Sequence, residues 1–260
     1  MVWVSVDRPS DAGPAGTVAV VSQGSVDPAD ALYARAAVGE VLAERRLRDG
    51  ARVRLATGGC AGGPTLVQVN LRVHGAPARV QVAGASTAHA IELAAERLRR
   101  QVRRLTTAYE PWPWPDPDRR PLGVPAAGSV RRRKSYRLHV GSPCQAVAFM
   151  NAMDYDITLF TDAETGEDAV VYRSGPTGLR LARQRTMRPP SLPVLLPLTV
   201  NAHRVATLTA ASAADRLVEG WLPHVFFTDR ETGRGNLLYR RYDGELGLVR
   251  PLETEVYSRP

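Results

Sequence analysis

FTDAETGE, residues 160–167, recurs as FTDRETGR at residues 227–234, 67 positions further along the chain. The alignment extends without a gap, with residues 133–183 matching residues 200–250. A sequence that repeats itself at a fixed spacing is typical of a duplicated structural unit. The second half of the chain is therefore predicted to contain two tandem copies of one small domain.

The carboxylates of the repeated motif raise the question of a metal-binding or catalytic loop. An EF-hand calcium loop has glycine at its sixth position and a bidentate glutamate at its twelfth. Counted from Asp162, glycine is fifth here and Arg173 is twelfth. A four-residue loop that ends in Gly166 suits a hairpin, because its last residue needs a positive φ. The motif predicts a hairpin tip and no metal site.

Each copy is predicted to fold in the order β-α-β-β-β. In the first copy residues 136–140 form a short strand, and Ser142 to Gln145 fit a capping box with proline at the first helical position. The helix is expected to bury Val147, Met150 and Met153, and the segments ITLFTD, DAVVYR and GLRLAR are the following strands. The second copy has Thr209 at the cap position but no Gln or Glu at N3, which predicts a weaker helix start.

Residues 17–108 show a different order, β-α-β-β-β-α. TVAVVS reads as a strand, and Asp27-Pro28 supplies an N-cap and a first-turn proline for a helix that ends near Arg46. The segments ARVRLAT, LVQVNLRV and ARVQVAG alternate with period two, as strands do. A second helix covers residues 86–109. Because each helix has one apolar stripe, both are expected to pack on one face of a single sheet.

A proline-rich linker separates the two halves, because prolines at every second position of EPWPWPDPDRRPLGVPAAGSV disfavour helix and strand. Two interpretations of Trp112 and Trp114 stay open: contact with a partner or a base, and packing on the nearer domain. The run RRRK at residues 131–134 is either a second RNA contact or a solvated domain edge.

The chain is thus predicted to be an α+β protein made of several segments. These are a disordered N-terminus at 1–16, a sheet domain at 17–108, a linker at 109–130, a first association domain at 131–186, a short linker at 187–199 and a second association domain at 200–253.

Composition limits the function classes. The formal net charge is +8 and comes from arginine, since Lys134 is the sole lysine. The planar guanidinium group of arginine forms bidentate hydrogen bonds with phosphates, so a polyanion partner is expected. Genome base composition can also enrich arginine. Cys60 and Cys144 are too few for a disulfide framework or a zinc site. With neither a secretion signal nor a run of roughly 18 apolar residues, a cytoplasmic protein without a membrane partner is expected.

No catalytic constellation is evident. The five histidines are scattered, without HExxH spacing. The glycine-rich run at residues 58–63 lacks the lysine and Ser/Thr of a phosphate-binding Walker loop. The sequence predicts a protein that is not an enzyme and needs no cofactor.

The strongest polar feature is the second helix of residues 17–108. At 100° per residue its arginines lie opposite the apolar stripe, with one at the flank. They are Arg97, Arg100, Arg103 and Arg104, with Arg99 flanking. One or two cations satisfy a helix dipole, whereas five within eight residues repel one another unless phosphates neutralise them. This face predicts contact with the backbone of structured RNA.

Three features taken together resemble one family. AIELAAERLRRQVRRL as last helix, a proline-rich linker and FTDAETGEDAVVYR with a following GLRL are similar to the long-form ribosome hibernation promoting factors. The resemblance implies an N-terminal domain that occupies the messenger and transfer RNA channel of the small ribosomal subunit and blocks translation. It implies ribosomal RNA contacts by Arg97, Arg100 and Arg104, and by the pair Arg45 and Arg46. It also implies packing or interface roles for Phe160, Tyr172, Phe227 and Tyr239.

The duplication departs from the usual family pattern, in which a single C-terminal domain joins two ribosomes. It resembles an actinobacterial, dormancy-associated branch of that family. Two copies on a short linker meet at an effective concentration on the order of millimolar, so they are expected to pair within one chain and to leave ribosomes single. Two alternatives stay open: a ribosome-dimerising factor, and a regulator that binds free RNA and uses the repeats to dock a protein.

Overall fold

The computed structural model describes residues 16–57, 63–107, 116, 130–174, 178–191, 196–241 and 244–252. The predictions for residues 1–15, the glycine-rich run at 58–62 with Cys60, and Trp112 and Trp114 lie outside these ranges. The chain forms two compact units. Among the described residues, one unit contains those from 16 to 116 together with 151–154, and the other contains those from 130 to 150 and from 155 to 252. No helix in the described part is long and apolar enough to cross a membrane.

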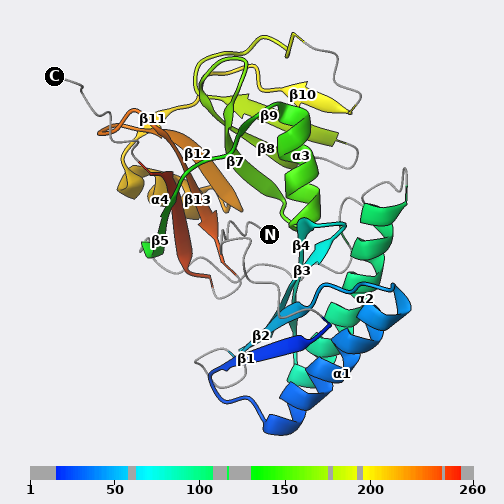
Figure 1. Ribbon diagram of the computed structural model, residues 1–260. Coiled ribbons are helices and arrows are strands. Elements are labelled where there is room, and N and C mark those ends of the chain that lie inside the picture. Colours follow the sequence, from blue (N-terminus) through cyan, green and yellow to red (C-terminus); the bar gives the residue numbers. More distant parts are fainter. Residues whose placement is uncertain are drawn as a thin grey trace, which may run out of the picture. The chain divides into compact units, whose positions relative to one another are not determined.

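The N-terminal unit is built on one four-stranded sheet in the order β1-β2-β3-β4. Its elements are β1 (Val18–Gln23), α1 (Pro28–Glu44), β2 (Ala51–Thr57), β3 (Thr65–Val73), β4 (Ala76–Gly84) and α2 (Thr87–Thr106). Strand β1 runs parallel to β2, and the other pairs are antiparallel. Both helices cover the same face of the sheet (Figure 1). The predicted order and the α+β class are confirmed.

Two features explain this arrangement: side chains that cap the two helices, and one apolar core that the helices share with the sheet. Asp27 Oδ1 accepts a hydrogen bond from Ala29 N at 2.8 Å, directly before Pro28. Ser86 Oγ caps α2 by accepting from His89 N at 3.2 Å. The apolar stripes of both helices then meet the inward side chains of the strands, including Val53. The sheet is left with one covered face and one polar face.

The C-terminal unit consists of two five-stranded sheets, with strand orders β10-β9-β8-β7-β6 and β11-β12-β13-β14-β5. The first repeat supplies β5 (Val130–Tyr136), β6 (Val140–Gly141), α3 (Pro143–Ala152), β7 (Ile157–Asp162), β8 (Asp168–Ser174) and β9 (Gly178–Arg183). The second supplies β10 (Leu198–Val200), β11 (Thr207–Leu208), α4 (Ala210–Glu219), β12 (His224–Asp229), β13 (Gly235–Arg240) and β14 (Leu246–Pro251).

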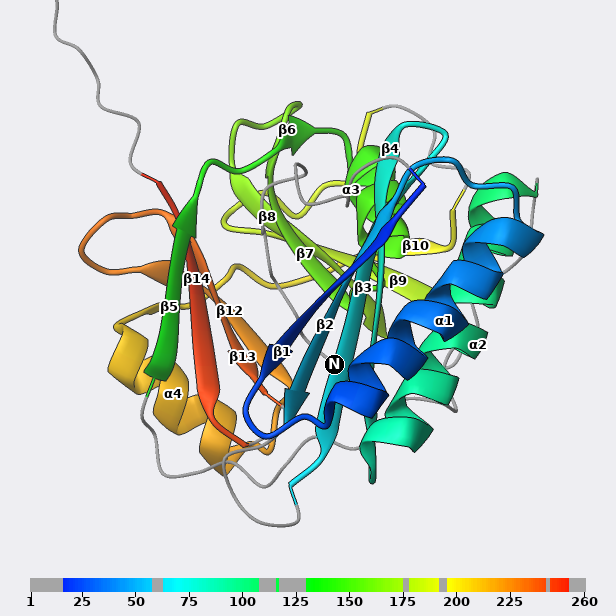
Figure 2. The same ribbon diagram turned by 60° about the horizontal axis from the view of Figure 1, so that its bottom comes forward.

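The first strand of each repeat belongs to the sheet of the other repeat. Strand β5 pairs in parallel with β14, with Lys134 opposite Val249 (Figure 2). Strand β10 pairs in parallel with β9, with Leu198 opposite Leu179 (Figure 1). The predicted strand at 136–140 is wrong in extent, because β5 ends at Tyr136 and β6 begins at Val140. The RRRK run lies inside β5, a strand at the edge of its sheet.

The facing sides of these two sheets share one apolar cluster. Its buried members are Leu138, Ile157, Leu159, Val170 and Ala182 from the first repeat and Leu237, Tyr239 and Val249 from the second. Tyr172 packs against this cluster and is partly buried. Phe160 is fully buried, and Phe227 is fully buried among residues of α4 and its sheet.

The turns and caps predicted for the repeats are confirmed. Gly166 and Gly233 have φ values of 68° and 67° at the two hairpin tips. Asp162 Oδ1 accepts from Glu164 N at 2.9 Å, and Asp229 Oδ1 accepts from Glu231 N at 3.0 Å. The helix caps at Ser142–Gln145 and Thr209 form as well. The motif carboxylates therefore fix the hairpin turns.

Candidate nucleic-acid interface

Arg97 does not lie on an exposed face, and that prediction is wrong. Its side chain belongs to the N-terminal unit and is buried with two carboxylates of the same unit. Arg97 Nε donates to Asp154 Oδ2 at 2.7 Å, and Nη2 donates to Asp116 Oδ2 at 2.6 Å. Burial lowers the pKa of Arg97, but the two carboxylates outweigh burial and raise this pKa above its usual value. The helical periodicity of α2 alone contained no sign of these partners.

Arg99 is also engaged inside the unit. Its Nε atom donates to Glu44 Oε2 at 3.0 Å, and its Nη2 atom lies 3.4 Å from Glu40 Oε2. These contacts tie α2 to α1, so Arg99 helps to hold the helix pair together. Ion pairs at this degree of exposure contribute little stability, about 0–1 kcal/mol each.

The other predicted arginines stay at the surface. Arg103 is exposed and Arg100 and Arg104 are partly exposed, all within the last two turns of α2. Arg100 Nε lies 3.8 Å from Glu96 Oε1 on the same helix. Arg45 and Arg46 directly follow α1 and are exposed. The surface cations thus lie at the C-terminal ends of α1 and α2, two neighbouring helices that the Arg99–Glu44 contact joins.

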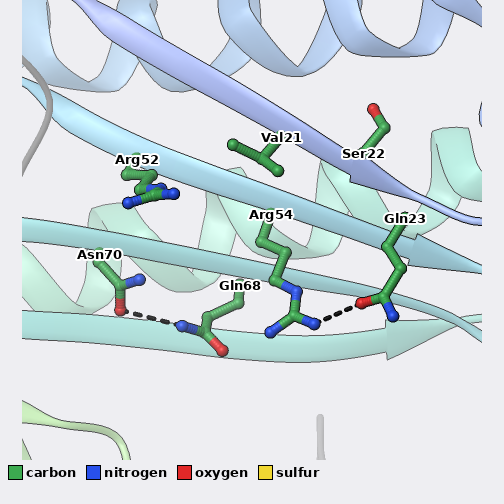
Figure 3. Close-up of a pocket in the computed structure, with 7 residues that line it drawn as sticks. All are labelled: Val21, Ser22, Gln23, Arg52, Arg54, Gln68 and Asn70. Atoms are coloured by element: carbon green, nitrogen blue, oxygen red, sulfur yellow. Dashed lines mark hydrogen bonds between the residues drawn. The ribbon is translucent and has the colours of Figure 1, made fainter. Parts of the chain in front are cut away.

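The face of the sheet turned away from the helices carries a second polar surface (Figure 3). Arg52 and Arg54 project from β2, and their partners on β3 are Asn70 and Gln68. Arg54 Nη2 donates to Gln23 Oε1 on the neighbouring strand β1. Gln68 Nε2 donates to Asn70 Oδ1 at 3.2 Å. These side chains line a pocket of about 360 Å³ together with Val21 and Ser22.

This arrangement suits an RNA backbone. Guanidinium groups bind phosphate oxygens in a fork, and the carboxamides of Gln and Asn both donate and accept hydrogen bonds. Among the described residues no carboxylate lines the pocket, so none of them repels a phosphate there. The described lining residues include no aromatic ring either, so contact with phosphate and ribose is expected rather than base stacking.

The sequence of β2 and β3 contains a signal for this surface. In ARVRLAT the arginines alternate with Ala51, Val53 and Leu55, which are buried. The same period of two places Gln68 and Asn70 on the matching side of β3. The alternation that predicted the strands therefore also indicates which side chains share the face turned away from the helices.

Comparisons with known proteins identify the chain. Residues 126–181 match the family described as Sigma 54 modulation/S30EA ribosomal protein C terminus. The Dormancy associated translation inhibitor of Mycobacterium tuberculosis, from strains CDC 1551 / Oshkosh and ATCC 25618 / H37Rv, is 51% identical over 257 residues. The alignment covers 95% of this chain and 93% of that protein. The chain belongs to the ribosome hibernation promoting factor family. This family consists of ribosome-associated translation inhibitors and is not a known class of enzymes.

Solved structures also match part of this hibernation factor. The N-terminal domain of Thermus thermophilus Protein Y is 24% identical, and a ribosomal subunit interface protein from Coxiella burnetii is 15% identical. Each match covers 34% of this chain, and they cover 98% and 94% of those proteins, with a TM-score of 0.28 in both cases.

Proposed function

We propose that this protein is a non-enzymatic hibernation factor of the cytoplasm that binds the small ribosomal subunit in its messenger and transfer RNA channel and inhibits translation. The observation that carries the proposal is the 51% identity, over 95% of the chain, to a dormancy associated translation inhibitor. The pocket on the polar sheet face, to which no described residue contributes a carboxylate, is consistent with it. Ribosomal RNA is the polyanion that this surface would meet.

The N-terminal unit would hold ribosomal RNA on two sides. One contact is formed by Arg52 and Arg54 with the neighbouring amides of the sheet. The other is formed by the remaining surface cations, which are Arg45, Arg46, Arg100, Arg103 and Arg104. Arg97 and Arg99 would act by holding the unit together, because both are already paired with carboxylates.

Within this function we further propose that the two repeats pair inside one chain and leave ribosomes single. Support comes from the exchanged strands, since β10 and β5 occupy the sheet edges beside β9 and β14. Polar contacts between the repeats add to it. Arg234 Nε donates to Asp168 Oδ2 at 2.7 Å, and Gln184 Nε2 donates to Gly233 O at 2.9 Å. The surfaces that a second chain would need are then already used.

Sucrose-gradient sedimentation of ribosomes with the full chain tests the single-ribosome mode. Single ribosomes carrying the protein are expected as the main peak. Removing residues 187–252 takes away β10 and β11 to β14, so it leaves β9 and β5 of the first repeat without their partner strands from the second repeat and should increase ribosome dimers. A dominant dimer peak with the full chain, lost when one repeat is deleted, would contradict this mode.

The salt dependence of binding to small ribosomal subunits tests whether Arg52 and Arg54 on the sheet surface contact RNA. The variant R52A/R54A should bind isolated small subunits more weakly, and the slope of log K against log[salt] should fall by about 2, or about 1 for each lost phosphate contact. R35A removes an exposed arginine of α1 and serves as the control, with little expected change. An unchanged slope in R52A/R54A would exclude this face as an RNA contact. Equal affinity for protein-free RNA would favour the free-RNA regulator instead.

A further inference from the structure

A pocket of about 330 Å³ lies between the two repeats of the C-terminal unit. From the first repeat it is lined by β8 and β9, and from the second by residues 201–206, α4 and the start of β12. Its described lining residues include Arg204, Arg216, His203 and His224, and none of them is a carboxylate. Its volume is at the lower end of the range of small-molecule sites, which starts near roughly 300 Å³.

The corresponding place in the other half of the unit is filled by large side chains. At the 67-residue spacing of the repeat, His203, Arg216, Leu222 and His224 correspond to Tyr136, Phe149, Tyr155 and Ile157. Tyr155 and Ile157 are 1% and 0% exposed, and the rings of Phe149 and Tyr155 are in edge contact, 6.2 Å apart. Tyr136 packs against the apolar cluster shared by the two sheets. The two copies have thus diverged at the same place, and only the second copy leaves it open and polar.

The two arginines of this pocket have no counter-ion among the described residues. Arg204 and Arg216 are exposed, and neither guanidinium makes a hydrogen bond or an ion pair with any residue that the structure describes. Two such guanidinium groups beside a cavity without carboxylates favour a phosphate, which they can bind through several hydrogen bonds at once.

The inner part of the pocket offers flat rings and one unused polar atom. His224 is partly exposed as a residue, but its Nδ1 atom is buried and has no hydrogen-bond partner among the described residues. The rings of His224 and Tyr172 are in edge contact at 5.2 Å, and Tyr172 Oη donates to Asn201 Oδ1 at 3.1 Å. Burial lowers the pKa of His224 to about 3, so the imidazole is neutral near pH 7. A neutral imidazole can hydrogen-bond to the edge of a base without adding charge.

We propose that this pocket binds a free nucleoside phosphate, with Arg204 and Arg216 on the phosphate and with His224, Tyr172 and Phe226 around the base. The cations supply affinity for the phosphate, and the aromatic side chains discriminate a nucleotide from a simple anion. The site depends on the duplication, because one wall comes from each repeat and only the second copy carries the polar side chains. A small metabolite could then act on the unit without touching the RNA surface of the N-terminal unit.

Isothermal titration of the full chain with the four nucleoside monophosphates and the four diphosphates tests the proposal. At least one of them should bind, and binding should weaken at least tenfold in R204A/R216A. R137A changes the equivalent of Arg204 in the first copy and should leave the affinity unchanged. The substitution His224→Ile introduces the residue that the first copy carries at this place, so it should keep the fold and abolish binding.

Several results would overturn the proposal. These are no binding of any nucleotide, an affinity for inorganic phosphate equal to that for the nucleotides, and unchanged binding in both R204A/R216A and His224→Ile. Binding of short single-stranded RNA without binding of any free nucleotide would also overturn it, and would assign the pocket to RNA. Thermal unfolding of each variant, compared with the parent chain, distinguishes a lost site from a lost fold.

Discussion

Replacing Asp162 by alanine should lower the free energy of unfolding by about 3–5 kcal/mol, because the change leaves Arg183 as a buried charge without its partner. Both side chains are fully buried, and Arg183 Nε lies 2.6 Å from Asp162 Oδ2. Arg183 Nη1 also donates to Arg188 O at 2.7 Å, which fixes the guanidinium in place. Urea unfolding of the full chain, followed by circular dichroism, measures the loss.

The second repeat supplies a matched control for this prediction. Asp229 forms the same turn contact as Asp162, but the residue equivalent to Arg183 is Arg250, which is exposed and donates to Ser135 Oγ at 3.1 Å. Asp229 also accepts from Thr232 N at 3.0 Å and from the buried Asn236 Nδ2 at 3.2 Å, but its loss strands no buried charge. D229A should therefore cost less than D162A, about 1–3 kcal/mol. Equal losses in D162A and D229A would show that the turn, and not the ion pair, accounts for the stability. The double variant D162L/R183M should recover most of the loss, since apolar side chains can replace a buried pair.

Replacing Tyr239 by alanine is expected to destabilise both repeats together, by about 3–5 kcal/mol as for other large buried aromatic side chains. Tyr239 is fully buried in the apolar cluster that both sheets share. Its ring packs directly against Gly247, because a Cβ atom added at Gly247 would lie only 2.3 Å from the ring. Hydrogen exchange of the full chain gives the measurement. Amides of β8 and β9 in the first repeat should exchange faster, although the substitution is in the second.

Tyr172 is the equivalent residue in the first repeat and provides the comparison. It is only partly buried, and its hydroxyl donates to Asn201. Y172A should therefore cost clearly less than Y239A. Faster exchange confined to β12, β13 and β14 in Y239A would mean that the repeats unfold independently, and the proposed pairing within one chain would lose its main support.

Much of this fold was predictable because the signals that specify it are local. Asp27, Ser142 and Thr209 cap helices as their sequence contexts predict. Gly166 adopts the positive φ that its turn requires, and period-two alternation locates the strands of the N-terminal sheet. Each of these features is determined by a few neighbouring residues, so it can be predicted from a single sequence.

The strand exchange could not be predicted in the same way. Strands β5 and β10 occupy equivalent places in two similar repeats, and hydrogen bonding of the backbone does not distinguish one sheet edge from the other. The alternation within β5 is the same whichever sheet it joins. The burial of Arg97 escaped prediction for a related reason, because its partner Asp154 is 57 residues away in sequence.

Reciprocal exchange also sets an order for synthesis and folding. Ser135 in β5 and Arg250 in β14 are 115 residues apart, so the second sheet cannot be completed until β14 has left the ribosome that makes it. The N-terminal sheet needs only nearby segments and can close earlier. A nascent chain would therefore complete its N-terminal unit first and its paired repeats last.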